Sequence, residues 1–343
     1  MKTLSKLFDR IWYDQKKYYW PVIFLLLPLS LAFFIVTFIR KQLLIKKQSH
    51  LPVPIIVVGN ISVGGTGKTP LLCALAQAFT KRGKRVGIVS RGYGGNFAEC
   101  TRLVSVNDDA ISVGDEPLLI ARTTECPVVV GRDRVAAAKH LLSAHKVEVI
   151  LSDDGLQHYA LPRDVEIVVV DAQRGVGNGF FLPAGPLREP ASRLQSVDFV
   201  VVNGLANSSN ALPNAKNILS VNLTPQHWVA VASGNIFPLE FLAKNTVVHA
   251  VAGIGNPSKF FSTLTSIGFS VIEHAFSDHH IFSERDFQFD DNLPVLMTEK
   301  DAVKCMGFAK ENWYALRVAM SLSDEWVDTV WHKASQVHSN YVG

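Results

Sequence analysis

Residues 53–70 read VPIIVVGNISVGGTGKTP, a run of Val and Ile that leads into a glycine-rich segment. Its end, GTGKT at residues 65–69, matches the phosphate-loop pattern G-x-x-x-x-G-K-[ST], although Ser62 stands at the first glycine position. A bare glycine-rich turn is the alternative interpretation. The loop, however, follows a strand-like run and precedes an amphipathic stretch, which is the setting of a phosphate loop. The stretch therefore predicts a nucleotide-binding loop between a strand and a helix.

This loop also predicts how a nucleotide is held. Its backbone N–H groups would surround the phosphates, and the N-terminus of the following helix would add positive potential. We expect Lys68 to reach the β- and γ-phosphates and Thr69 to bind Mg²⁺. The expected nucleotide-binding residues are Ser62, Val63, Gly64, Gly65, Thr66, Gly67, Lys68 and Thr69.

The expected nucleotide is ATP. Guanine-specific phosphate-loop proteins carry the pattern N-K-x-D after a late strand. The similarly placed TEKD, residues 298–301, has Glu299 where that lysine belongs. ATP and Mg²⁺ are therefore the cofactors that the sequence predicts.

From residue 53 onward, short Val/Ile runs alternate with amphipathic stretches. Such runs separated by helices indicate an α/β fold, with a parallel sheet covered by helices on both faces as in phosphate-loop NTPases. The expected strands lie at 54–60, 85–90, 126–131, 147–153, 165–172 and 197–204, and the expected helices at 69–82 and 132–145.

A second, smaller α/β unit is expected after an Asn- and Ser-rich linker at 205–217. Its strands are expected at 246–257, 268–276 and 293–302, and its helix at 257–267. The phosphate-loop domain would then span 49–210, and the second domain 211–343 would complete the active-site cleft.

The N-terminal region contains an uncharged apolar run at 21–39, PVIFLLLPLSLAFFIVTFI. It is long enough for a helix to cross the hydrocarbon core of a bilayer. A cleaved signal peptide and a buried core helix are the alternatives, but no small-x-small cleavage site follows and lysines surround the run. We predict a membrane anchor at 1–48, with a cytoplasmic catalytic part because the loop uses ATP. Whether the helix spans the bilayer or lies tilted in one leaflet stays open, since Pro28 can kink it.

Charge and composition limit the partners. The chain has 343 residues, of which 48% are hydrophobic and 19% charged, and its net charge is +4. The first 50 residues are rich in Lys and Arg on both sides of the apolar run, so anionic lipid headgroups fit this cluster better than nucleic acid. No nucleic-acid-binding module is recognised. The four scattered cysteines are typical of a reducing compartment.

Polar residues close several expected strands, where ligands of such folds collect: Asn60, Ser90, Asp153 and Asp171. Asp153 and Asp154 follow a buried strand, at the position of the second Mg²⁺ contact in phosphate-loop enzymes. Adjacent carboxylates point in different directions, so one can hold Mg²⁺ while the other orients water or the loop. A solvated DDG turn is the alternative interpretation.

GDEP at 114–117 places Asp115 and Glu116 in an expected loop before a helix. Asp115 is a candidate N-cap or a candidate base that takes the proton of an attacking hydroxyl. His279 and His280 follow Asp278, with no third metal ligand at suitable spacing. A histidine that orients a carboxylate base and a partly buried, hydrogen-bonded histidine are both compatible with the pattern.

Two further loops contain candidate contacts. LPAGPLREP brings Arg188 next to Glu189, so this arginine either stabilises charge on the transferred phosphoryl group or pairs with its neighbour. SRGYGG at 90–95 has three glycines after a strand, which indicates a close approach of the backbone to a ligand. Arg91 and Tyr93 in that loop are candidate nucleotide or sugar-phosphate contacts.

Taken together, the motifs resemble one family. GNISVGGTGKTP, SRGYGG, GDEP, GRDR, SDDGLQH, LPAGPLREP, SDHHIF and TEKDAVK follow one another behind an apolar N-terminal helix. Over nearly its whole length the chain resembles the tetraacyldisaccharide 4'-kinases, the lipid A kinases of Gram-negative bacteria. The resemblance implies an inner-membrane enzyme that moves the γ-phosphate of ATP to the 4'-hydroxyl of a tetraacyldisaccharide 1-phosphate. The product would be the 1,4'-bisphosphate of lipid A biosynthesis.

The resemblance also implies roles for individual residues. Asp115 matches the proposed catalytic base, His279 the histidine paired with it, and Arg188 the arginine near the phosphates. The implied magnesium residues are Thr69, Glu116, Asp153 and Asp154, and the candidate substrate contacts are Arg91, Tyr93, Gln157 and His158. The implied partners are the acylated disaccharide lipid and inner-membrane lipids. No protein partner is identified.

Two other classes compete with a kinase. A membrane-tethered phosphate-loop ATPase, acting as a switch or transport partner, would use water as its acceptor. The Asp115 and His279 pair argues against it, because a base is needed to activate a sugar hydroxyl. A non-enzymatic nucleotide-binding scaffold would need neither Thr69 nor a strand-end carboxylate. The dependence of ATP turnover on lipid disaccharide separates these classes.

Overall fold

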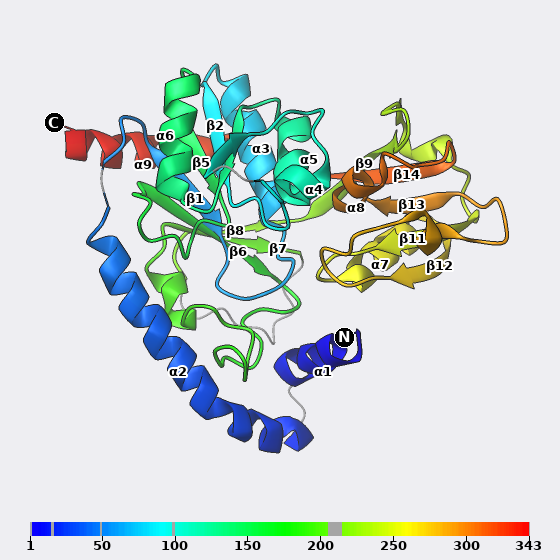
Figure 1. Cartoon of the computed structure of the whole chain (residues 1–343), viewed down its shortest axis with the longest axis horizontal. Coiled ribbons are helices and arrows are strands. Elements are labelled where there is room, and N and C mark those ends of the chain that lie inside the picture. The colour runs from blue at the N-terminus through cyan, green and yellow to red at the C-terminus, as the bar shows by residue number, and fades with distance from the viewer. Residues whose placement is uncertain (1, 15–16, 49, 98–99, 205–214, 343) are drawn as a thin grey trace.

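The computed structural model describes residues 2–14, 17–48, 50–97, 100–204 and 215–342, with the side chains of 2–6, 17, 341 and 342 left aside. Within this part of the chain, two β-sheets lie side by side, and two N-terminal helices run along one side of the molecule (Figure 1). The predicted linker at 205–217 falls mostly outside the described residues, which resume at residue 215.

The first sheet has eight strands in the order β3-β4-β2-β5-β1-β6-β7-β8. It is parallel except at its edge, where β3 pairs antiparallel with β4. Its strands are β1 (Ile55–Gly59), β2 (Val86–Ser90), β3 (Thr101–Leu103), β4 (Val128–Gly131), β5 (Val149–Asp153), β6 (Val165–Asp171), β7 (Phe199–Asn203) and β8 (Ile218–Val221). All six strands predicted for this domain are present, because continuous Val/Ile runs fit a sheet that is buried on both faces.

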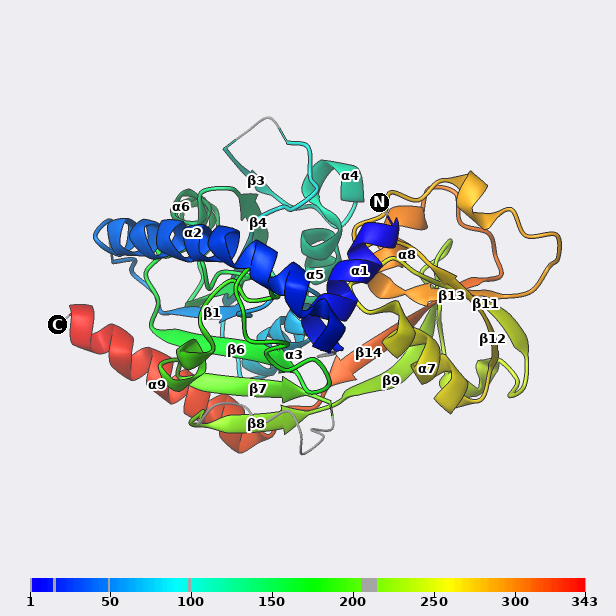
Figure 2. The same cartoon turned by 90° about the horizontal axis from the view of Figure 1, so that it is seen from below.

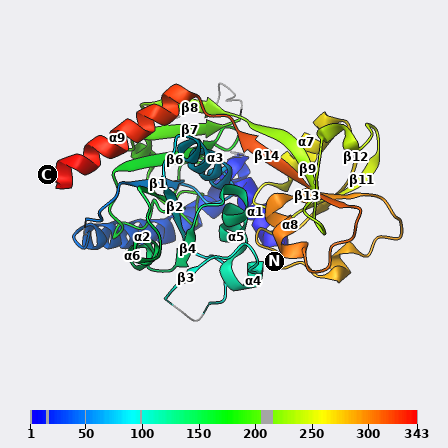
Figure 3. The same ribbon diagram turned by 90° about the horizontal axis from the view of Figure 1, so that it is seen from above.

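Helices cover both faces of this sheet, as predicted. Helices α3 (Lys68–Lys81), α5 (Asp115–Thr124) and α9 (Asp324–Val342) contribute apolar side chains to one core. Helix α6 (Arg134–Ala144) and the 3₁₀ helix η2 (Ala191–Gln195) contribute to the core on the opposite face. The short helix α4 (Ala110–Val113) precedes α5. Figure 3 shows α9 and α6 on opposite sides of the sheet.

The second sheet has six strands in the order β10-β9-β14-β13-β11-β12. Its strands are β9 (Leu223–Ala230), β10 (Ile236–Phe237), β11 (Val247–Ala252), β12 (Ser270–Ala275), β13 (Val295–Thr298) and β14 (Trp313–Met320). Helix α7 (Pro257–Ile267) and the 3₁₀ helix η3 (Leu239–Phe241) pack on one face. Helix α8 (Glu299–Cys305) and the 3₁₀ helix η4 (Glu284–Phe287) pack on the other. The three predicted strands and the predicted helix are present, whereas β9, β10 and β14 were not predicted.

The two sheets do not divide the chain at the predicted domain boundary between residues 210 and 211. Strand β8 pairs with β7 and so belongs to the first sheet. Helix α9 returns to the same sheet, where Trp326, Val327 and Val330 are buried in its core. The chain therefore passes between the two units twice, once between β8 and β9 and once between β14 and α9.

Two helices precede the first sheet: α1 (Lys2–Tyr13) and α2 (Trp20–Ile45), joined by the 3₁₀ helix η1 (Lys17–Tyr19). Helix α2 is long and apolar enough to cross a membrane, with a mean hydropathy of 2.8 over its most apolar window, only 11% of which is buried. This exposure argues against a core helix. Figure 2 shows α2 and α1 lying across one face of the molecule.

Candidate active site

Two buried asparagines at strand ends contact carbonyl groups of the phosphate loop. Asn203, at the end of β7, donates a hydrogen bond from Nδ2 to the Thr66 carbonyl at 3.0 Å, and Asn60 Nδ2 lies 3.5 Å from the Gly64 carbonyl. With these carbonyls turned inward, the loop N–H groups are left to face a phosphate. Gly67 has a φ of 95°, and a Cβ there would lie 2.5 Å from Asn203 Nδ2, so only glycine fits.

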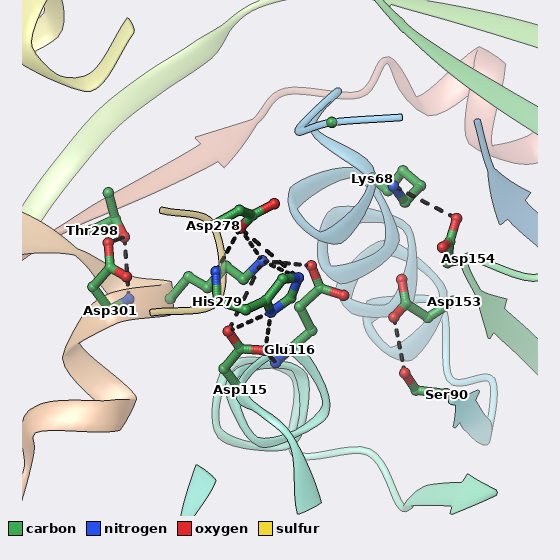
Figure 4. Close-up of polar contacts among 12 residues, drawn as sticks. Lys68, Ser90, Asp115, Glu116, Asp153, Asp154, Asp278, His279, Thr298 and Asp301 are labelled. Atoms are coloured by element: carbon green, nitrogen blue, oxygen red, sulfur yellow. Dashed lines mark hydrogen bonds and ion pairs between the residues drawn. The ribbon is translucent and has the colours of Figure 1, made fainter. Parts of the chain in front are cut away.

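The strand-end carboxylates Asp153 and Asp154 point in different directions, as predicted (Figure 4). Asp153 is buried at the end of β5, where one oxygen accepts a hydrogen bond from Ser90 Oγ at 3.0 Å. Its other oxygen has no hydrogen-bond partner among the described residues. Burial and the neighbouring charges of Glu116 and Asp154 raise the pKa of Asp153 to about 7. A divalent cation would satisfy the free oxygen and hold the carboxylate ionised.

Asp154 forms two ion pairs. It has a φ of 44° and lies 3.6 Å from Lys68 Nζ and 3.1 Å from an Arg188 guanidinium nitrogen. Burial alone would raise the pKa of Asp154, but Lys68 and Arg188 hold it well below its usual range. Arg188 thus contacts Asp154 and also Gln157, at 3.4 Å. The alternative pairing of Arg188 with Glu189 is wrong, since Glu189 binds Arg193, Gln157 and Tyr159 instead.

On the other side of the cleft, the second unit brings a histidine to the predicted base. His279 Nδ1 lies 3.1 Å from Asp115 Oδ2 and 3.3 Å from Asp115 Oδ1. Burial opposes a charged imidazole, but the hydrogen bond to Asp115 raises the pKa of His279 above its ordinary value. Burial likewise opposes ionisation of Asp115, yet the bond from His279 and the nearby charge of Lys300 lower its pKa. The two side chains therefore stabilise each other's charged forms.

Asp115 is the first residue of α5, with Gly114 as the N-cap, and so does not lie in a loop before a helix. The N-cap interpretation is wrong for this reason. His280, which follows His279 in the sequence, lies 3.4 Å from Asp286 and does not contact Asp115.

Sequence reasoning missed Lys300, the lysine of TEKD. Its Nζ lies 2.9 Å from Glu116, 3.2 Å from Asp278 and 3.4 Å from His279 Nε2. Three nearby carboxylates raise the pKa of Lys300 despite its burial. Figure 4 shows Glu116 between the Asp115 and His279 pair and the Lys68 and Asp154 pair. Through its bond to Glu116, Lys300 connects α8 to α5 across the cleft.

TEKD lies in the second unit, where Thr298 ends β13 and Glu299, Lys300 and Asp301 begin α8. Glu299 forms an ion pair with Arg317, and the fully buried Asp301 accepts hydrogen bonds from Thr298 Oγ1 and the Gly253 N–H. Asp301 thereby joins the loop at Gly253 to the start of α8, whereas Thr298, Glu299 and Lys300 line the cavity that contains the phosphate loop.

Arg134, from the GRDR motif, was also not assigned a role. It is 2% exposed, and its guanidinium donates to the Gly131 and Asp153 carbonyls at 2.8 and 3.1 Å. Burial lowers the pKa of Arg134 to about 10. The side chain thereby fixes the end of β5 from which both strand-end carboxylates project. The position of Arg134 shortly after the end of an expected strand was the sequence signal that could have indicated this role.

A cavity of about 1640 Å³ lies between the two units, and Glu116 and His279 line it although Asp115 itself does not. It is lined by the loop from Val63 to Thr69, by both strand-end carboxylates and by His279. Of the candidate substrate contacts, Arg91, Tyr93 and Gln157 line it, and the Tyr93 ring lies 4.8 Å from the His279 ring. His158 does not line the cavity. Burial and the charges of Arg134 and Arg91 lower the pKa of His158 to about 3, so it is neutral at physiological pH.

The residues fit a phosphate-loop magnesium site. Among the described residues, no three His, Cys, Asp or Glu side chains form a complete metal site. Magnesium bound with a nucleotide needs no such cage, because phosphate oxygens and water complete its shell. The unpartnered oxygen of Asp153 supplies the expected carboxylate, and Thr69 and Glu116 line the same cavity.

Comparisons with known proteins point to one family. A family model described as "Tetraacyldisaccharide-1-P 4'-kinase" matches residues 22–335. A tetraacyldisaccharide 4'-kinase of Hahella chejuensis is 47% identical over 340 residues, covering 97% of each chain. One of Alkalilimnicola ehrlichii is 52% identical over 276 residues, 78% of each chain. A crystal structure of LpxK from Aquifex aeolicus in complex with ATP has a TM-score of 0.76 and 29% identity, covering 92% of this chain and 99% of that chain.

Proposed function

The chain belongs to the tetraacyldisaccharide-1-P 4'-kinase family, and we propose that its cleft works as the active site of an ATP-dependent lipid kinase with Asp115 as base. The enzyme transfers the γ-phosphate of ATP to the 4'-hydroxyl of a tetraacyldisaccharide 1-phosphate. Family membership favours this activity over a membrane-tethered ATPase. The observation that carries the proposal for the site is the 3.1 Å contact between Asp115 and His279, which come from different units.

In the proposed reaction the 4'-hydroxyl oxygen attacks the γ-phosphorus, and the bond to the bridging oxygen of ADP breaks. The hydroxyl proton passes to Asp115, which is ionised at neutral pH because its pKa is lowered. His279 orients this carboxylate through Nδ1, and Lys300, paired with Glu116 at 2.9 Å, lies 3.4 Å from the other ring nitrogen. Lys68 and Arg188 supply positive charge for the phosphoryl oxygens.

Magnesium, when bound, would neutralise charge on the phosphate oxygens. Thr69, Glu116 and Asp153 are the residues that would hold it, with Asp154 fixed beside them by Lys68 and Arg188. The pKa of Asp153 is raised to about 7, so at neutral pH a proton competes with magnesium for this carboxylate. We expect magnesium affinity to fall as the pH drops below this value.

Helix α2 supports a location of this cleft at a membrane. Its length and hydropathy suit a bilayer, and the substrate is an acylated lipid. We propose that the enzyme sits on the inner membrane with its catalytic part in the cytoplasm, where ATP is available. Tethering enzyme and substrate to the same surface raises their effective concentration.

The test is whether ATP turnover depends on the lipid. Purified protein in neutral detergent micelles is given MgATP with and without tetraacyldisaccharide 1-phosphate, and ADP release is followed. A kinase gives turnover that rises with the lipid and is near zero in its absence. Equal ADP release with and without lipid is the behaviour of an ATPase and would overturn the proposal.

A further inference from the structure

Helix α2 forms part of the active-site cavity as well as the candidate membrane anchor. Seven residues in the second half of this helix line the same cavity as the phosphate loop: Phe33, Phe34, Thr37, Phe38, Arg40, Lys41 and Gln42. Phe181 and Leu182 add apolar surface to the cavity, and the Phe34 and Phe181 rings lie 5.0 Å apart. This end of the cavity is therefore apolar along the helix and becomes cationic where the helix approaches its end.

The two cations at that point are not neutralised. Within the described part of the chain, neither Arg40 nor Lys41 has a carboxylate within 4.0 Å, whereas Arg163 and Arg193 both form ion pairs. Lys41 Nζ instead lies 4.7 Å from the centre of the Tyr159 ring. An ammonium group over an aromatic face, beside a cavity, is in a position to bind an anion.

The nearby carboxylates already have partners. Glu189 is 6% exposed, forms an ion pair with Arg193 at 3.2 Å, and accepts hydrogen bonds from Gln157 and Tyr159. Glu166 is bound by Arg163 at 3.0 Å and by Arg193. Neither carboxylate is within ion-pair distance of Lys41, so the positive charge at the end of α2 faces the cavity.

We propose that Arg40 and Lys41 bind the 1-phosphate of the lipid substrate. This inference rests on the proposed function, which supplies a substrate with acyl chains, a disaccharide and one phosphate. In that arrangement the acyl chains lie beside the phenylalanines of α2, and the phosphate meets the two cations. The 4'-hydroxyl, at the other end of the disaccharide, points along the cavity toward Asp115.

This orientation gives the cations a role in selection. A disaccharide bound the other way round would leave its phosphate away from the two cations and would bring no 4'-hydroxyl to Asp115. The cations favour the orientation in which the free hydroxyl reaches the phosphate loop. The same residues therefore add affinity for the substrate and choose which end of it reacts.

Anionic phospholipid is the competing source of a phosphate. Lys46 and Lys47 belong to the same basic cluster and are exposed, but they do not line the cavity. Headgroup attraction by the cluster as a whole would involve all four residues about equally, at roughly 1 kcal/mol for each basic residue near the surface. A phosphate subsite in the cavity involves Arg40 and Lys41 alone, which makes Lys46 a matched control.

The experiment compares two acceptors: tetraacyldisaccharide with and without its 1-phosphate, in neutral micelles. The variants are Lys41→Met, which keeps the apolar stem over Tyr159, together with Arg40→Gln, Lys41→Arg and the control Lys46→Met. We expect Lys41→Met and Arg40→Gln each to raise KM for the phosphorylated acceptor about tenfold, the usual loss for a hydrogen bond to a charged group. The KM for the acceptor without phosphate should not change, Lys41→Arg should restore binding, and Lys46→Met should match the unaltered protein.

Three results would overturn the inference. Equal losses on both acceptors would show that the cations act without contacting the phosphate. Equal losses in Lys46→Met would assign the effect to the basic cluster as a whole. Losses that arise only when anionic phospholipid is added to the micelles, whichever acceptor is used, would assign the cations to bilayer headgroups. Failure of the unaltered protein to phosphorylate either acceptor would instead count against the proposed function, and circular dichroism of each variant identifies misfolding.

Discussion

At the residue scale, the site depends on paired charges that lower or raise each other's pKa. Asp115 and His279 favour each other's charged forms, and Asp154 is held ionised by Lys68 and Arg188. Asp153 is the exception, since burial raises its pKa to about 7. Asp115 and Asp154 are therefore ionised at neutral pH, whereas Asp153 would become fully ionised on binding a cation.

The first prediction concerns the base. Asp115→Asn keeps the shape of the side chain but removes its capacity to accept a proton, so kcat should fall about a hundredfold or more, the usual range for a lost general base. The affinity for ATP, measured by fluorescent nucleotide displacement, should change little because Asp115 does not contact the phosphate loop. A variant with near-normal kcat would show that another group takes the proton.

The second prediction is a pH dependence of stability. The pKa of His279 is raised in the folded protein by Asp115, so the pair stabilises the fold fully below the unfolded-state value near 6.5. That stabilisation is lost as the pH rises through the raised folded-state pKa. The difference in thermal midpoint between the unaltered protein and His279→Gln should therefore be largest at mildly acidic pH and shrink at alkaline pH. A difference that grows with pH would contradict the pairing.

At the scale of elements, the loop before Arg188 connects helices α1 and α2 to the phosphate loop. Ser30 Oγ of α2 donates to the Phe181 carbonyl at 2.9 Å and accepts from the Ala184 N–H at 3.0 Å, and Trp12 Nε1 donates to the Pro183 carbonyl. The same loop meets the phosphate loop where the Val63 N–H donates to the Pro186 carbonyl at 2.9 Å. It then continues into Arg188, so α2 supports a segment that ends in the active site.

The third prediction tests this support. Ser30→Ala leaves the buried Ala184 N–H without its partner, which costs about 1–3 kcal/mol, whereas the Phe181 carbonyl keeps its bond from the Gly185 N–H. Thermal unfolding in micelles should move to lower temperature, and kcat should fall because Arg188 is less firmly placed. The control is Leu31→Ala, one residue along the helix and 59% exposed. Equal behaviour of the two variants would mean that the Ser30 bonds do not support the loop.

The fourth prediction concerns the strand ends that hold the phosphate loop. Asn203→Ala removes the bond to the Thr66 carbonyl and should raise KM for ATP about threefold to tenfold, the usual net value of one hydrogen bond. Asn203→Asp places a carboxylate against that carbonyl, so its KM should rise further. Comparison of the two ATP titrations is the measurement. An aspartate variant that binds ATP better than the alanine variant would contradict this role for Asn203.

At the scale of the whole molecule, the active site exists because two sheets meet. Gly255, before α7, lies so close to the phosphate loop that a Cβ on it would be 2.6 Å from the Gly65 nitrogen. Arg174 of the first unit donates to the Gly255 carbonyl at 3.1 Å, and Lys259 lies 3.3 Å from Asp171. These contacts hold the second unit, and with it His279, over the nucleotide-binding loop.

Most of the fold was predictable because buried parallel strands are continuous Val/Ile runs, a pattern that few other structural elements produce. Strands β9 and β14 mix polar and apolar residues, since they face the core only in part, and β3 is too short to give a pattern. Helix α9 was missed because its apolar residues bury against a sheet that lies more than 100 residues earlier in the sequence.

Site residues that belong to a sequence motif were predictable, whereas those defined by contacts between distant segments were less so. The phosphate loop follows from its glycines and lysine, and the strand-end position of Asp153 suggested a metal contact. The Asp115 and His279 contact joins residues 164 positions apart, so the residues alone left it open and only the family resemblance implied it. The roles of Lys300, Asn203 and Arg134 come from side-chain contacts that no local pattern records.

The fate of the transferred phosphate distinguishes a lipid kinase that uses Asp115 as its base from every alternative. Full-length protein and Asp115→Asn are incubated with γ-labelled ATP, Mg²⁺ and tetraacyldisaccharide 1-phosphate in micelles, and the lipids are separated by chromatography. We predict a labelled 1,4'-bisphosphate from the unaltered protein and almost none from the variant. Label found only as free phosphate would contradict the kinase activity, and a variant that labels the lipid at the normal rate would contradict the role of Asp115.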